Sequence, residues 1–159
     1  MKKILFIVFL LLLMIGAKNF PQKMDGVKVT DAGTFEGSIN GKTFSDMIRY
    51  GEAEDLVTIA TGDKNFTLTI NCKDVSTISE LKTGNYKLPS DKNITVLFVD
   101  NNAAVPCIIT EGSLNITENN YERLKGTLSF TASMGGIPKG MGGAETKLSN
   151  GNFEILKKK

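Results

Sequence analysis

The sequence contains no histidine and no tryptophan, and only two of its 159 residues are cysteines. Without an imidazole, the chain cannot build a Ser-His-Asp or Cys-His catalytic arrangement, and it lacks the usual general base at neutral pH. Two sulfurs and no histidine also fall short of the four ligands of a structural zinc site. The composition therefore excludes histidine-dependent catalysis, and it predicts neither a metal site nor a cofactor.

The sequence also lacks a large excess of charge of one sign. Met1-Lys2-Lys3 precedes an uncharged run from Ile4 to Ala17, which is typical of a secretory signal peptide and shorter than the roughly 20 residues that span a bilayer. Cleavage after Ala17 would remove two of the 19 basic residues and leave 17 against 17 acidic ones. Nucleic-acid-binding proteins carry clustered basic residues, so a neutral mature chain argues against that class.

We therefore expect export to the periplasm or the extracellular space. Attachment to the cell surface stays open, as does an uncleaved leader that acts as a membrane anchor. Residues 1–17 are the predicted signal peptide. Residues 18–34 show little periodicity and are predicted to be a tether, and residues 35–159 are predicted to form a single β domain.

Apolar and polar residues alternate along most of the predicted domain. In the longest example, Gly112–Ser133, Leu114 and Ile116 alternate with polar residues before Asn119-Asn120 reverses the chain, and a second alternating arm follows. Gly126 falls on the apolar face of that arm, where its missing side chain either admits a large neighbour or marks a bulge. This stretch predicts a long antiparallel hairpin with one buried face.

Turn signals separate further strands. Asn40-Gly41 is a strong hairpin signal, because a type I′ turn requires positive φ at both positions. Ser149-Asn150-Gly151 predicts another hairpin, between Thr146–Leu148 and Asn152–Leu156. The segment Asp74–Gly84 is either a short helical turn with a capping box or an ordered loop.

The fold class follows from the number and spacing of these strands. About nine or ten short strands with turn residues between them predict an all-β fold, either an antiparallel β-sandwich or a β-barrel built from hairpins. Ile94–Val99 is apolar on both faces, which predicts a central or covered strand.

The two cysteines are Cys72 and Cys107. Cys72 shares the parity of the apolar residues in its strand and is predicted to face inward. In an oxidising compartment the pair either forms a disulfide or remains as two buried free thiols, which behave as small hydrophobic residues.

The glycine-rich segment Met134–Glu145 is the strongest candidate for a binding element. It does not match a phosphate-binding loop, because Lys139 precedes Gly140 and no serine or threonine follows. We interpret it either as a flexible lip over a binding surface or as a solvent-exposed connection. The candidate partner-binding residues are Met134, Ile137, Lys139 and Met141.

Paired carboxylates could hydrolyse glycosides without histidine. A group of acidic residues is close together in the sequence, although carboxylates of this frequency are usually surface residues. These residues are Glu36, Asp46, Glu52, Glu54 and Asp55.

Several segments of the sequence resemble those of small exported β-rich envelope proteins of unknown function from Gram-negative bacteria. The similar stretches are Gly112–Thr117, Gly126–Ala132, Asn150–Ile155, Asn40–Phe44 and Gly84–Leu88. The resemblance implies an envelope or secreted location and supplies no catalytic residues. Many proteins of this group are lipid-anchored, whereas this chain lacks the anchor cysteine after its leader.

We therefore predict an exported, non-enzymatic β protein that binds an envelope protein, a glycan or a small ligand. Its contact with a membrane would be limited to an uncleaved leader. The first alternative is a lipocalin-like β-barrel that carries a small apolar ligand. The second is a carboxylate-dependent glycan hydrolase.

Overall fold

The fold is known from a computed structural model that describes residues 28–102, 105–135 and 144–157. Nine strands belong to one antiparallel sheet. They are β1 (Lys28–Ile39), β2 (Lys42–Ala53), β3 (Leu56–Gly62), β4 (Phe66–Lys73), β5 (Gly84–Leu88), β6 (Ile94–Asp100), β7 (Val105–Asn119), β8 (Arg123–Met134) and β9 (Glu145–Leu156).

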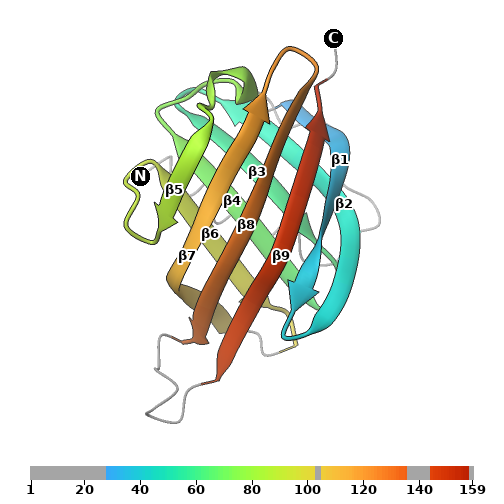
Figure 1. The fold of residues 1–159 in the computed structure, drawn as a ribbon, viewed down its shortest axis with the longest axis vertical. Helices are drawn as coiled ribbons and strands as arrows, with labels where there is room; N and C mark the ends of the chain where they lie inside the picture. The colour runs from blue at the N-terminus through green and yellow to red at the C-terminus, as the bar shows by residue number, and fades with distance from the viewer. Residues whose placement is uncertain (1–27, 103–104, 136–143, 158–159) are drawn as a thin grey trace.

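Eight of these strands close into a barrel (Figure 1). Around the wall they follow the order β7, β6, β4, β3, β2, β1, β9, β8, and β8 pairs back with β7. β7 pairs with β6 only at its start, and β5 takes that edge of β7 farther along, opposite Gly112–Ile116. The all-β prediction is confirmed, and of the two architectures left open the barrel is the one formed.

The local signals explain several of these elements. Asn40 and Gly41 have φ values of 51° and 81°, as a type I′ turn requires between β1 and β2. Gly126 stands opposite Phe153 on β9, and a Cβ atom at Gly126 would lie 2.4 Å from the ring of Phe153. Gly126 therefore makes room for a large neighbour, which was one of the two roles expected for it.

Two parts of the sequence form longer strands than expected. Ser149-Asn150-Gly151 is not a hairpin turn, because β9 runs through it without reversing. Its pairing with β8 shifts register there and Asn150 has a φ of 53°, so this stretch is a bulge. β1 begins at Lys28, and a register shift between Asp31 and Gly33 interrupts its alternation. The domain therefore begins earlier than Phe35, where regular alternation starts.

The barrel interior is filled by side chains that form one apolar cluster. A continuous series of ring contacts crosses it, with centroid separations from 4.9 to 6.2 Å. In order around the wall, the rings are Phe153, Phe35, Phe44, Phe66, Phe98 and Phe130. Every phenylalanine within the described ranges belongs to this series. Aromatic packing therefore links six of the barrel strands.

One end of the barrel, called here the capped end, is covered by the connection from β4 to β5. This connection contains a single turn of 3-10 helix, Ile78–Glu80, so the segment Asp74–Gly84 includes a short helical turn. Ile78 and Leu81 are 2% and 6% exposed and belong to the core cluster. No helix in the described part of the chain is long and apolar enough to cross a membrane.

Candidate functional site at the hairpin end

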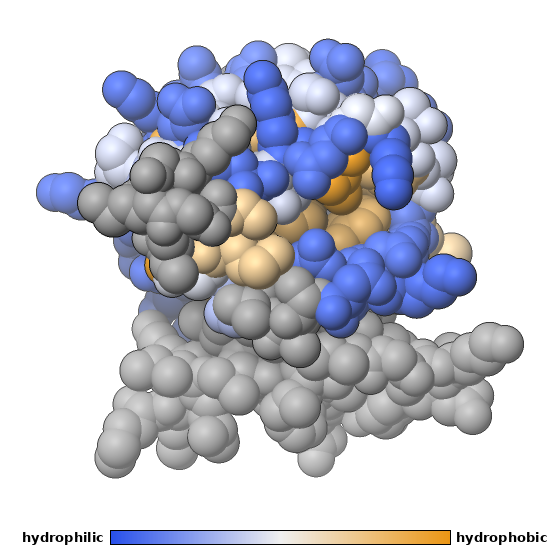
Figure 2. Space-filling model, turned by 90° about the horizontal axis from the view of Figure 1, so that it is seen from below, coloured by the Kyte–Doolittle hydropathy of each residue, from blue (hydrophilic) through white to orange (hydrophobic). Residues whose placement is uncertain are grey.

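The opposite end of the barrel, called here the hairpin end, contains the β1–β2 and β3–β4 turns. Three partly buried apolar residues lie there on the inner side of the wall: Ile39, Phe44 and Met134. Figure 2 views the barrel from this end and shows apolar residues set back between polar ones. The hairpin end therefore presents an apolar surface within a polar surround.

Strand register places each of the three side chains. Ile39 stands opposite Leu148 on β9, and Met134 stands opposite Cys107 on β7, so both share the inner face with buried residues. Phe44 stands opposite Gly37, which has no side chain to compete for the space. Its ring stacks on Phe35 at 5.4 Å and meets the edge of Phe66 at 4.9 Å. Ile39, Phe44 and Met134 are referred to below as the apolar rim.

The turns around the apolar rim are held by hydrogen bonds. Asp63 Oδ1 accepts from the amides of Asn65 and Phe66 at 2.7 and 3.1 Å, and Asn101 Nδ2 donates to the Asp63 carbonyl oxygen at 3.1 Å. The β1–β2 turn is tied to β9, because the Lys147 amide donates to Asn40 Oδ1 at 2.8 Å. These contacts fix the polar edge, so the rim is largely preformed for binding.

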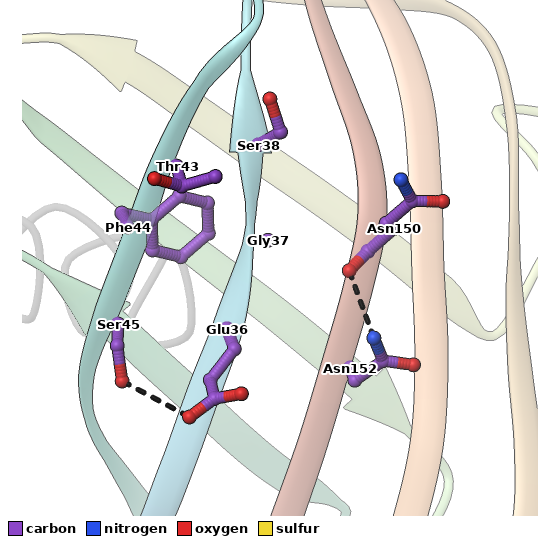
Figure 3. A pocket seen from close by; sticks show the side chains of 8 residues that line it. All are labelled: Glu36, Gly37, Ser38, Thr43, Phe44, Ser45, Asn150 and Asn152. Carbon is purple, nitrogen blue, oxygen red and sulfur yellow. Dashed lines mark hydrogen bonds between the residues drawn. The ribbon is translucent and has the colours of Figure 1, made fainter.

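A depression of about 490 Å³ lies on the outer wall next to Phe44 (Figure 3). Ser45 Oγ donates to Glu36 Oε1 at 3.2 Å on one side, and Asn152 Nδ2 donates to the Asn150 carbonyl oxygen at 2.9 Å on the other. Its lining is otherwise small and polar. The polar groups face solvent and are partly paired with one another, so this depression is a weaker candidate than the apolar rim.

Of the candidate partner-binding residues, the structure describes only Met134, which lies in the apolar rim. Ile137, Lys139 and Met141 lie outside the described residues. Sequence reasoning missed Ile39 and Phe44. The signal was present in part, since Ile39 directly precedes the Asn40-Gly41 turn and Phe44 follows Gly41 after two polar residues.

The acidic residues are not gathered in one cleft. Glu36 pairs with Ser45 and faces outward, whereas Asp46 pairs with Phe35 and shares the inner face. Glu52 lies at the capped end, where its Oε1 accepts from the Ile78 amide at 2.8 Å. Among the described residues, no group of three or more acidic or cysteine side chains could hold a metal ion.

The two cysteines are free thiols, and the disulfide considered from the sequence is not formed. Cys72 pairs with Ile94 and Cys107 pairs with Phe98, and these two partners stand four residues apart on β6. Four residues of strand span about 13 Å, well beyond the Cα separation that a disulfide tolerates. Burial raises the pKa of Cys72 to about 12, helped by the nearby charge of Asp91. Burial also raises the pKa of Cys107.

Comparison with known proteins identifies no relative. No protein-family model matches the sequence, and neither a curated protein nor a solved structure matches it significantly.

Proposed function

We propose that the protein is an exported, non-enzymatic binding protein whose apolar rim receives an apolar group of an envelope component, such as an acyl chain or an apolar side chain. The single observation that carries this proposal is the difference between the barrel ends. At the capped end Ile78 and Leu81 are buried and Val75 of the same connection is partly buried, whereas all three residues of the apolar rim stay partly exposed inside a polar edge. Partly exposed apolar surface that is rimmed by polar residues is characteristic of binding sites.

The packed interior favours binding at the rim over deep enclosure of a ligand. Phe98 and Phe130, which face the middle of the barrel, are 2% and 3% exposed, and their rings lie 5.5 Å apart. A lipocalin-like carrier needs an internal space that holds its ligand. A carrier function is therefore the second candidate, and it would require these rings to move aside.

The test is a titration of the purified protein with 11-(dansylamino)undecanoic acid, a fluorescent fatty acid. We expect saturable binding that Met134→Glu weakens by about tenfold or more, because a carboxylate at the rim would have to be desolvated beside the bound chain. The matched control is Leu156→Glu. Leu156 is 57% exposed and pairs with Arg123 near the capped end, so its replacement should leave the affinity unchanged.

The apolar rim is not the binding site if no saturable binding is found, or if Met134→Glu and Leu156→Glu weaken the affinity equally. Circular dichroism of both variants checks that each keeps its β fold. The carrier function would be favoured instead if the fluorescence shows that the probe is completely buried. In that case the packing of Phe98 and Phe130 should also weaken on binding.

A further inference from the structure

The depression on the outer wall offers a different chemistry from the apolar rim. Glu36 and Ser45 lie on one side of it, Asn150 and Asn152 lie on the other, and Gly37 stands between the two pairs (Figure 3). Because Gly37 has no side chain, none divides the two pairs. Of the described residues that line the depression, Glu36 alone carries a charge. A space of about 490 Å³ is large enough for a small ligand.

The bulge in β9 supplies one of these side chains. Leu148 and Gly151 are buried, whereas Ser149 and Asn150 between them both lie on the outer side of the wall. The positive φ of Asn150, 53°, belongs to this bulge. Bulges re-aim side chains and are frequent beside functional sites. In β9 the bulge adds an outward amide at the edge of the depression, which a regular strand would not place there.

The polar pairs keep hydrogen-bonding capacity for a ligand. Ser45 Oγ donates to Glu36 Oε1 at 3.2 Å, and Glu36 Oε2 remains as a second acceptor. Asn152 Nδ2 donates to the Asn150 carbonyl oxygen at 2.9 Å, and an amide group has a second N–H and its own oxygen besides. The existing contacts therefore orient Glu36 and Asn152 without using up their donors and acceptors.

Strand register extends this polar surface beyond the depression. Six outward residues stand opposite one another in a single row across β5, β7, β8, β9, β1 and β2. In order, they are Asn85, Asn115, Thr127, Asn152, Glu36 and Ser45. With strands about 4.8 Å apart, the row is about 24 Å long. It is therefore long enough for a chain-like ligand whose end occupies the depression.

Outward positions nearer the capped end are charged instead. Lys125 Nζ lies 3.3 Å from Glu154 Oε1, and Arg123 Nε lies 2.9 Å from Glu118 Oε1. The row through the depression consists of amides and hydroxyls apart from Glu36. These groups both donate and accept hydrogen bonds, as the hydroxyl groups of a sugar do. A ligand rich in neutral hydroxyl groups matches this row, whereas an anionic ligand would meet the carboxylate of Glu36.

We propose that the outer wall binds a neutral oligosaccharide, with one end in the depression and the chain lying along the polar row. Glu36 and Asn152 hold the sugar hydroxyls in the depression, and Asn115 and Thr127 contact the units that follow. Serine, threonine and asparagine side chains are short, so little conformational entropy is lost when they are immobilised. This site is separate from the apolar rim and takes a ligand of another class.

The test is an NMR titration of the isotope-labelled protein with the neutral hexasaccharides maltohexaose, cellohexaose and chitohexaose. We expect at least one of them to shift the backbone amide signal of Gly37 saturably. Asn152→Ala should weaken that binding by about fivefold or more, because hydrogen bonds to the sugar are lost. Ser38→Leu should also weaken it, since a leucine there fills part of the depression. The matched control is Asn93→Ala, an exposed asparagine between β5 and β6, which should leave the affinity unchanged.

The proposal is overturned if none of the hexasaccharides binds saturably, or if Asn152→Ala and Asn93→Ala have equal effects. It is also overturned if hexagalacturonate, an anionic hexasaccharide, binds more tightly than the neutral ones. Circular dichroism checks that each variant keeps its β fold. None of these results bears on the apolar rim, because Asn152 and Ser38 are not part of it and the fatty-acid titration is a separate measurement.

Discussion

The two ends of the barrel are closed by different means. At the capped end a connection of several residues folds inward, and Ile78 and Leu81 fill the opening. At the hairpin end the β1–β2 connection is the two-residue turn Asn40-Gly41, which is too short to fold over the opening. Among the described residues, the difference is that one connection places buried apolar side chains over the capped end, whereas the described turns of the hairpin end place none there.

The largest predicted effect tests whether the cap is part of the core. We expect Ile78→Ala to lower the free energy of unfolding by about 2–4 kcal/mol, because Ile78 is fully packed and its truncation leaves a cavity. Met134→Ala, at the partly exposed rim, should lower it by only about 1 kcal/mol. Urea denaturation followed by circular dichroism measures both values. Equal losses would mean that the two ends are equally packed.

The next effect concerns the polar contacts that hold the cap. Asn119 Nδ2 donates to the carbonyl oxygens of Ile78 and Leu81 at 3.0 and 2.6 Å, and Lys157 Nζ donates to Asn119 Oδ1. Asn119→Ala should therefore cost about 1–3 kcal/mol, since it leaves partly buried carbonyl groups without a donor. Asn152→Ala is the control. Asn152 is exposed on β9, so its loss should cost less than about 0.5 kcal/mol in the same urea experiment. A negligible effect of Asn119→Ala would show that apolar packing alone holds the cap.

The fold could be predicted from the sequence wherever a local rule was sufficient. The alternation of residues fixed the all-β class, and Asn40-Gly41 located the β1–β2 hairpin. The same kind of signal failed at Asn150, because an asparagine with positive φ occurs both in turns and in bulges. Pairing of β9 with β1 and β8 on either side decides between them, and these pairings join residues that are distant in the sequence.

The candidate site was less predictable than the fold. Met134 was identified from its place beside a glycine-rich segment, whereas Phe44 resembled any other core residue of an alternating strand. Its partial exposure depends on which end of the barrel receives a cap. The cap depends on contacts such as Asn119 to Ile78, which are 41 residues apart. Periodicity within one strand carries no information about such contacts.

The smallest predicted effect uses the two thiols as reporters of the two ends. Cys72 lies near the capped end and is 1% exposed, and Cys107 faces Met134 at the hairpin end and is 5% exposed. With a pKa of about 12, Cys72 stays protonated at pH 8.5, where an unfolded cysteine with a pKa of 9.0 is partly ionised.

We therefore expect iodoacetamide at pH 8.5 to modify Cys107 before Cys72 in the native protein, with peptide mass spectrometry as the measurement. In urea at about 8 M, which unfolds the protein, the two rates should become equal. The sign of the pH effect follows from the same shift. Because the folded protein holds the Cys72 proton more tightly, its stability should fall as the pH rises from about 9 toward about 12. If Cys72 and Cys107 are modified at equal rates in the folded protein, the cap excludes iodoacetamide no better than the apolar rim does. The two ends would then differ in shape but not in how well they protect the core.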